Sequence, residues 1–190
     1  MKKKNVIKSV LILAVAAGTA SFTSTMEKKI NIEESTIEWK GKKVLGSHNG
    51  TINLQDGHLE MEGDQLTGGQ FTVDMTSITV TDLKGEDKAK LEGHLKSDDF
   101  FGVDNYATSK LVINSATKNG NTYAVNGDIT IKGKTEPITF DLVMGESAAT
   151  TNFKIDRTKF GVRYGSGSFF DNLGDNTISN DFTLDVTLKF

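Results

Sequence analysis

Three histidines are the residues of this sequence best suited to metal chemistry, because the imidazole ring is a common zinc ligand and also a general base. They are His48, His58 and His94, and no two of them have the short spacing typical of a zinc site. Each is also expected in a different structural segment. The sequence therefore predicts no metal site.

Nucleophilic and acid–base chemistry would need a serine or a pair of carboxylates in a recognisable setting. Neither Gly46-Ser47-His48 nor Gly165-Ser166-Gly167 makes the Gly-x-Ser-x-Gly motif of a hydrolase nucleophile. Asp98 and Asp99 are adjacent, and the side chains of neighbours on a helical turn point apart. Such residues normally serve as charges at a helix N-terminus rather than as an acid–base pair. Residues 161–167 are rich in glycine but lack the lysine of a phosphate loop. We predict that the protein is not an enzyme, and a hydrolase or isomerase acting on a bound lipid is the weakest alternative.

Two aromatic doublets favour binding of an apolar molecule instead. Phe100-Phe101 and Phe169-Phe170 lie outside the alternating segments described below, and Leu91 and Leu95 lie four residues apart on one side of an expected helix. Two roles are open for these side chains. They are either plugs that close the ends of the fold or the lining of a cavity mouth for an apolar ligand.

The elements that position these residues are mostly strands, because apolar and polar residues alternate along the chain. The pattern is clearest near the C-terminus, at Phe182, Leu184, Val186, Leu188 and Phe190. Turn-forming pairs such as Asp56-Gly57 and Asn119-Gly120 predict antiparallel hairpins. We count about eight strands within residues 36–190, one short helix over residues 85–96, and a Gly/Ser-rich loop over residues 163–175.

Eight such strands form either a sandwich or a closed barrel, and alternation alone does not decide between them. Glycines in or near the strands, such as Gly68, Gly69 and Gly127, are typical of bulges and bends that let a sheet curl. The fold class is therefore all-β and antiparallel, in one domain.

The first twenty residues have the composition of a secretory signal peptide. Four lysines precede an apolar run over residues 10–17, and the triplet Gly18-Thr19-Ala20 predicts cleavage near Ala20. The run is shorter than the roughly 20 residues that span a bilayer, so a retained anchor is the less favoured alternative. Residues 21–35 are expected to form a flexible lead.

Export leaves an acidic protein without cysteine. Four of the 22 basic residues lie within the first twenty, so 18 remain against 25 acidic residues, which gives a net charge of −7. This balance argues against nucleic acid and anionic membrane surfaces as partners. A chain without cysteine carries no disulfide and no lipid-modified N-terminal cysteine. We expect a periplasmic or otherwise extracytoplasmic protein without stable membrane insertion.

Several motifs resemble the YceI-like family in the same order along the chain. The most specific is Leu91-Glu92-Gly93-His94-Leu95-Lys96-Ser97-Asp98-Asp99-Phe100-Phe101, which Ser77-Ile78 precedes and Tyr106 follows. Trp39, His48-Asn49-Gly50, the Gly127–Gly133 segment leading to Pro137, and the Ile155–Gly161 segment are also similar. The family often has proline after the tyrosine, whereas this chain has Ala107.

This resemblance implies an eight-stranded lipocalin-like barrel over residues 36–190 that carries a long isoprenoid chain, such as a quinone or polyprenol, without covalent bonding. No cofactor is expected to be required, although an isoprenoid lipid or quinone is expected in the barrel, and a homodimer is an open alternative for assembly. An envelope adaptor whose barrel is filled by side chains and binds a protein is the second hypothesis. Candidate lipid contacts are Phe71, Val73, Ile78, Leu91, Leu95, Phe100, Phe101, Phe169 and Phe170, with His94 and Arg163 as candidates for a head group.

Overall fold

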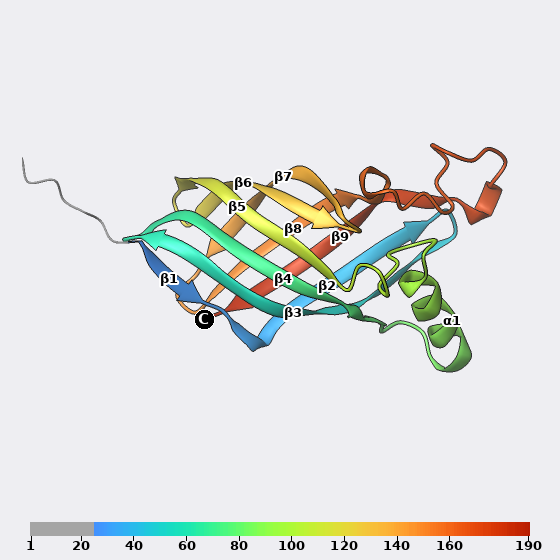
Figure 1. Cartoon of the computed structure of the whole chain (residues 1–190), viewed down its shortest axis with the longest axis horizontal. Helices are drawn as coiled ribbons and strands as arrows, with labels where there is room; N and C mark the ends of the chain where they lie inside the picture. The colour runs from blue at the N-terminus through green and yellow to red at the C-terminus, as the bar shows by residue number, and fades with distance from the viewer. Residues whose placement is uncertain (1–24) are drawn as a thin grey trace, which may run out of the picture.

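The computed structural model describes residues 25–190 as an eight-stranded, antiparallel, closed β-barrel with one α-helix (Figure 1). The predicted fold class is confirmed. The strands are β1 (Met26–Lys29), β2 (Asn31–Lys43), β3 (Gly46–Glu62), β4 (Gln65–Val80), β5 (Thr108–Asn119), β6 (Thr122–Ile131), β7 (Lys134–Met144), β8 (Ala148–Asp156) and β9 (Ile178–Lys189). The helix is α1 (Gly85–Lys96), and the short 3-10 helices are η1 (Arg157–Phe160) and η2 (Gly174–Asn176).

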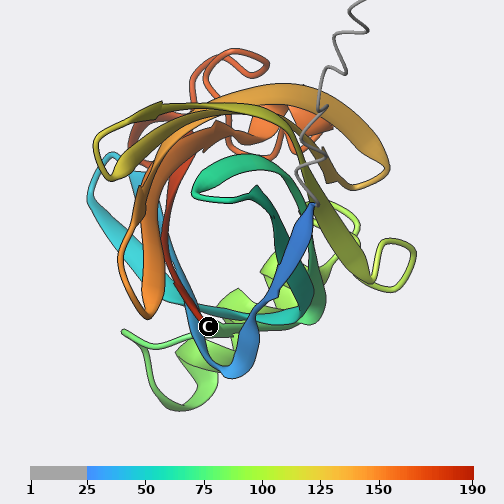
Figure 2. The same cartoon turned by 90° about the vertical axis from the view of Figure 1, so that its left-hand side faces the viewer.

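The barrel closes because the two strands at the ends of the eight-stranded order, β3 and β4, also pair with each other. The order around the wall is β3-β2-β9-β8-β7-β6-β5-β4, and β4 returns to pair with β3. Strand β1 pairs with the last part of β3, so β1 and β2 occupy the same place in the wall at different heights. Seen end-on, the strands form a ring (Figure 2).

The ordered barrel begins earlier than the sequence led us to expect. Met26 pairs with Met61 and Lys29 with His58, and β2 begins at Asn31. Strand structure thus occupies much of the stretch expected as a flexible lead over residues 21–35, because the edge of β3 offers backbone partners there. The expected signal peptide, residues 1–20, lies outside the described residues.

One predicted turn is confirmed and another is wrong. Asn119-Gly120 lies at the β5–β6 hairpin, where Gly120 has φ 63°. Asp56-Gly57 is instead inside β3, next to a register irregularity. A side chain at Gly57 would come within 2.6 Å of the Phe71 ring, so this glycine gives the ring room rather than reversing the chain.

The predicted helix over residues 85–96 is confirmed and lies across one end of the barrel, which we call the cap end (Figure 1). Leu95 is buried against the barrel interior. The Glu92 carboxylate accepts a 2.8 Å hydrogen bond from the backbone N–H of Val80, the last residue of β4. The helix is therefore fixed to the rim by apolar packing and by a hydrogen bond to β4. The other end of the barrel, which carries the β3–β4, β5–β6 and β7–β8 turns, is the turn end.

Candidate ligand cavity

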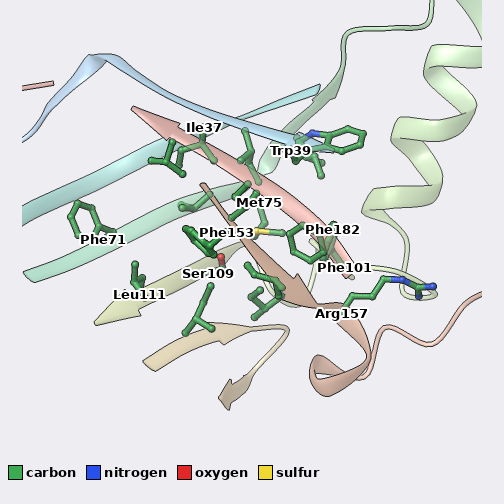
Figure 3. A pocket seen from close by; sticks show the side chains of 18 of the residues that line it. Ile37, Trp39, Phe71, Met75, Phe101, Ser109, Leu111, Phe153, Arg157 and Phe182 are labelled. Carbon is green, nitrogen blue, oxygen red and sulfur yellow. The ribbon is translucent and has the colours of Figure 1, made fainter. Parts of the chain in front are cut away.

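An apolar cavity of about 160 Å³ lies inside the barrel. Inward-facing side chains from β2, β3, β4, β5, β6, β7, β8 and β9 line it, together with the loop after α1 (Figure 3). Leu59, Leu66 and Val125 are almost completely buried towards the turn end and do not belong to the lining. The lining runs from Arg157 at the cap end to Leu142 and Leu188, and the barrel beyond them is filled by packed side chains.

Strand alternation explains why the lining is apolar. On β4, Phe71, Val73 and Met75 all face the cavity, and the residues between them do not. The same period brings Phe153 and Ile155 of β8 into the lining. Most of the lining thus follows the two-residue period of a strand, as expected for a barrel whose interior holds side chains and one slender ligand.

Trp39 is the only tryptophan of the chain and lies on the cavity wall (Figure 3). Its ring is held in place, because the indole N–H donates a 3.1 Å hydrogen bond to the carbonyl oxygen of Thr79. Tryptophan at this position gives the cavity a large rigid surface and a spectroscopic reporter of its contents.

Arg157 is the buried charged residue of the lining, to which the exposed Lys110 and Asp181 also belong. The Arg157 side chain is 2% exposed, and its guanidinium donates to the carbonyl oxygens of Ser179 (2.9 Å), Val162 (2.9 Å) and Ile178 (3.1 Å). Figure 3 shows the side chain directed away from the centre of the cavity. Burial lowers the pKa of Arg157, while the charge of Asp156 opposes that effect. The residue therefore fastens the segment after β8 to β9 at the cap end.

The groups considered for metal binding or catalysis are dispersed. His48 contacts Asp82 at 3.0 Å, and His58 lies 3.3 Å from Glu27. His94 lies between the Phe100 and Tyr164 rings, with centroid distances of 5.5 and 4.3 Å. Within residues 25–190, no group of three or more His, Cys, Asp or Glu side chains is arranged to hold a metal ion.

The two acid–base and nucleophile candidates have ordinary structural surroundings. Asp98 and Asp99 are exposed in the loop after α1. The Ser166 hydroxyl is buried and donates a 2.7 Å hydrogen bond to the Asn180 side-chain oxygen. Neither position combines a nucleophile with a base.

A family model for the YceI-like domain matches residues 29–190, nearly the whole of the described chain. The chain belongs to the YceI-like family. Among curated relatives, a UPF0312 protein of Staphylococcus epidermidis is 30% identical over 150 residues, covering 72% of this chain and 83% of the relative. A UPF0312 protein of Pseudomonas putida is 29% identical over 196 residues, covering 93% and 94%.

Solved structures share the YceI-like fold at low identity. Burkholderia cenocepacia BcnA is 19% identical with a TM-score of 0.70, over 84% of this chain and 98% of the other. A polyisoprenoid binding domain from Saccharophagus degradans is 11% identical with a TM-score of 0.58, over 84% and 95%. These likenesses concern the fold of the barrel.

The YceI-like barrel brings six of the nine predicted lipid contacts together on the cavity wall, and these are Phe71, Val73, Ile78, Leu95, Phe100 and Phe101. Leu91 packs against the core from outside the lining. Phe169 and Phe170 are 45% and 50% exposed and do not line the cavity, because the loop that carries them points outward.

Neither predicted head-group residue of the YceI-like barrel lies on the cavity wall. The Arg163 guanidinium lies over the Phe169 ring at 4.6 Å, in the same exposed loop. His94 contacts the Phe100 ring in a T-shaped arrangement but does not itself line the cavity.

Sequence reasoning did not select Arg157 or Trp39 as lining residues, although the signal was present. Arg157 follows Phe153 and Ile155, and Trp39 follows Ile37, at the two-residue spacing of side chains that face the barrel interior.

Proposed function

We propose that this protein binds the long apolar chain of an isoprenoid or related lipid in its barrel and carries or sequesters it without chemical change. The observation that carries the proposal is the apolar cavity enclosed by the YceI-like barrel. Each methylene transferred from water to such a cavity contributes roughly 0.8 kcal/mol, so an unbranched or isoprenoid tail binds without a charged anchor. The Saccharophagus degradans neighbour, described as a polyisoprenoid binding domain, supports the same ligand class.

Several features of the wall agree with a reversible carrier. The lining is mostly apolar, and its polar members are Ser109, Lys110, Thr151, Arg157, Ser179 and Asp181. Specificity would therefore come from the length and width of the chain more than from a polar head group. The adaptor alternative expects an interior filled by side chains, and the cavity weighs against it.

The extracytoplasmic location is part of this proposal. It rests on the lysine-rich and apolar N-terminal segment, which would direct export before cleavage near Ala20. Within residues 25–190, no helix is both long and apolar enough to cross a membrane. A homodimer stays a prediction, which light scattering of the purified protein would check.

The test combines extraction with rebinding. Lipid extracted from protein purified from its host should contain an isoprenoid or long-chain species in mass spectrometry. The delipidated protein should then bind a naphthoquinone that carries a four-unit isoprenoid tail, measured as quenching of Trp39 fluorescence. Absence of both the co-purified lipid and the quenching would contradict the proposed function.

A further inference from the structure

The wall of the barrel has one seam, between β7 and β8. Within the described chain, only Val143 with Thr150 and Met144 with Ala149 pair across it, next to the hairpin turn. In contrast, the whole of β6 pairs with β7, and the whole of β8 pairs with β9. The two strands therefore separate from the turn end towards the cap end, beside the level of the cavity.

The orientation of the backbone groups shows that β7 and β8 lack a hydrogen-bond ladder along most of the seam. The two-residue β6–β7 turn has positive φ at Lys132 (51°) and Gly133 (71°), so the pair that closes it is hydrogen bonded. Alternate residues from Thr135 onward then direct their backbone groups towards β8. Pro137, the only proline, is one of these and has no N–H to donate. Nearer the β7–β8 hairpin, the carbonyl group of Asp141 also points towards β8, and it accepts a 2.7 Å hydrogen bond from the Thr151 hydroxyl instead of from a backbone N–H.

Side chains close the seam on the inside. Continuing the hairpin register places Phe140 opposite Phe153, and their rings stack with centroids 4.8 Å apart and planes 20° apart. Both rings line the cavity, as do Leu142 and Thr151 beside them. At this level the barrel is therefore held shut by aromatic stacking rather than by a backbone ladder.

Both ends of the barrel are more firmly closed than the seam. Leu95, Phe100 and Phe101 are buried at the cap end, and Leu59 and Leu66 are completely buried towards the turn end. Passage through either end would displace several packed side chains. Separation of β7 from β8 requires a rotation of Phe153, which is only half-buried, and the loss of the Thr151–Asp141 hydrogen bond.

We propose that the apolar tail of the ligand enters and leaves the cavity through this seam, with the Phe140–Phe153 stack as its gate. The inference rests on the proposed function, since it concerns the passage of the same isoprenoid or acyl chain. It adds a lateral route to the cavity and names the residues that control it.

The absence of cysteine allows a direct test in the full chain. In Asp141→Cys/Asn152→Cys, a short thiol-to-thiol linker would join β7 to β8 across the seam. Stopped-flow quenching of Trp39 by the tetraisoprenoid naphthoquinone should become about tenfold slower after linking. The matched control is Thr117→Cys/Ala124→Cys, two exposed partners in the fully paired β5–β6 ladder, and linking it should leave the rate unchanged.

Equal uptake rates before and after linking the seam would overturn the lateral route while leaving lipid binding intact. If the unlinked protein shows no quenching at all, the proposed function fails, and the route fails with it. These two failures are therefore distinguishable.

Two alanine variants keep the test decisive if the linked pair does not fold. Phe153→Ala removes half of the stack and should make uptake about threefold faster. Tyr164→Ala loosens the cap by removing the ring that packs on His94. Faster uptake in Tyr164→Ala together with an unchanged rate in Phe153→Ala would assign entry to the cap end and overturn the proposal.

Discussion

The indole N–H of Trp39 donates to the carbonyl oxygen of Thr79 across the β3 strand that separates them, over a distance of 3.1 Å. Gly50 of β3 pairs with Trp39 on one side and with Val80 on the other, and it makes this contact possible, since a Cβ there would lie 1.8 Å from the Thr79 oxygen and 2.8 Å from the indole ring. The glycine therefore determines where the largest ring of the cavity wall can lie.

Gly50→Ala is expected to lower the free energy of unfolding by about 1–3 kcal/mol, because the methyl group would push the indole away from Thr79. Urea unfolding would measure the loss, and Trp39 emission would shift as the indole hydrogen bond breaks. Gly41→Ala is the matched control, because a Cβ at Gly41 meets nothing within 4 Å. Equal stability of the two variants would contradict the assignment.

Val73→Phe is expected to weaken binding of the naphthoquinone about tenfold, or about 1.4 kcal/mol, because the larger ring would occupy the cavity. Titration of Trp39 quenching would measure the dissociation constant. Val112→Phe is the control, since Val112 is 40% exposed on the outer face of β5. Unchanged binding in Val73→Phe, with the variant folded, would place the ligand elsewhere.

Arg157→Gln is expected to destabilise the protein by about 3 kcal/mol, because three backbone carbonyls would lose a buried charged donor. Hydrogen exchange should become faster in residues 161–178, which Arg157 fastens to β9. Arg163→Gln removes an exposed arginine from the same region and should change stability by less than about 0.5 kcal/mol. Similar effects of the two substitutions would exclude the fastening role.

Asp82 is expected to make the free energy of unfolding fall at acidic pH. Burial raises its pKa, but hydrogen bonds from His48 and from the Asn49 N–H outweigh burial and hold the pKa below 3.8. A carboxylate with a lowered pKa stabilises the folded state above its unfolded pKa and loses that contribution as the pH falls through the folded value.

In Asp82→Asn, the free energy of unfolding near pH 7 should fall by no more than about 1 kcal/mol, because the pair is partly exposed. The difference from the unsubstituted protein should shrink below about pH 4. Urea unfolding at several pH values measures it. A difference that stays constant from pH 7 to pH 3 would show that Asp82 acts by packing alone.

Local patterns determined most of the barrel wall. Alternation identified the strands, because successive side chains of a strand point to opposite faces wherever the strand lies. The helix over residues 85–96 was also predictable, because its acidic first turn and leucine spacing are properties of the helix itself. The family motifs, and with them the choice of a barrel over a sandwich, were likewise available in the sequence.

The two aromatic doublets show that a local sequence pattern does not predict which loop residues become buried. Phe100-Phe101 is buried against the cavity and Phe169-Phe170 is exposed, although both are adjacent phenylalanines in loops. A loop has no periodicity that states which way it folds, so its direction depends on the contacts made around it. Only the tertiary structure decided these positions.

Alternation gave each strand an inward face but carried no information about how far each neighbouring pair stays hydrogen bonded. The alternation could have identified Arg157 as an inward-facing residue. The three carbonyl groups to which Arg157 donates, however, belong to segments that meet only in the folded chain. The separation of β7 from β8 is likewise a property of the closed barrel, because the twist and curvature of the whole sheet decide where a wall parts.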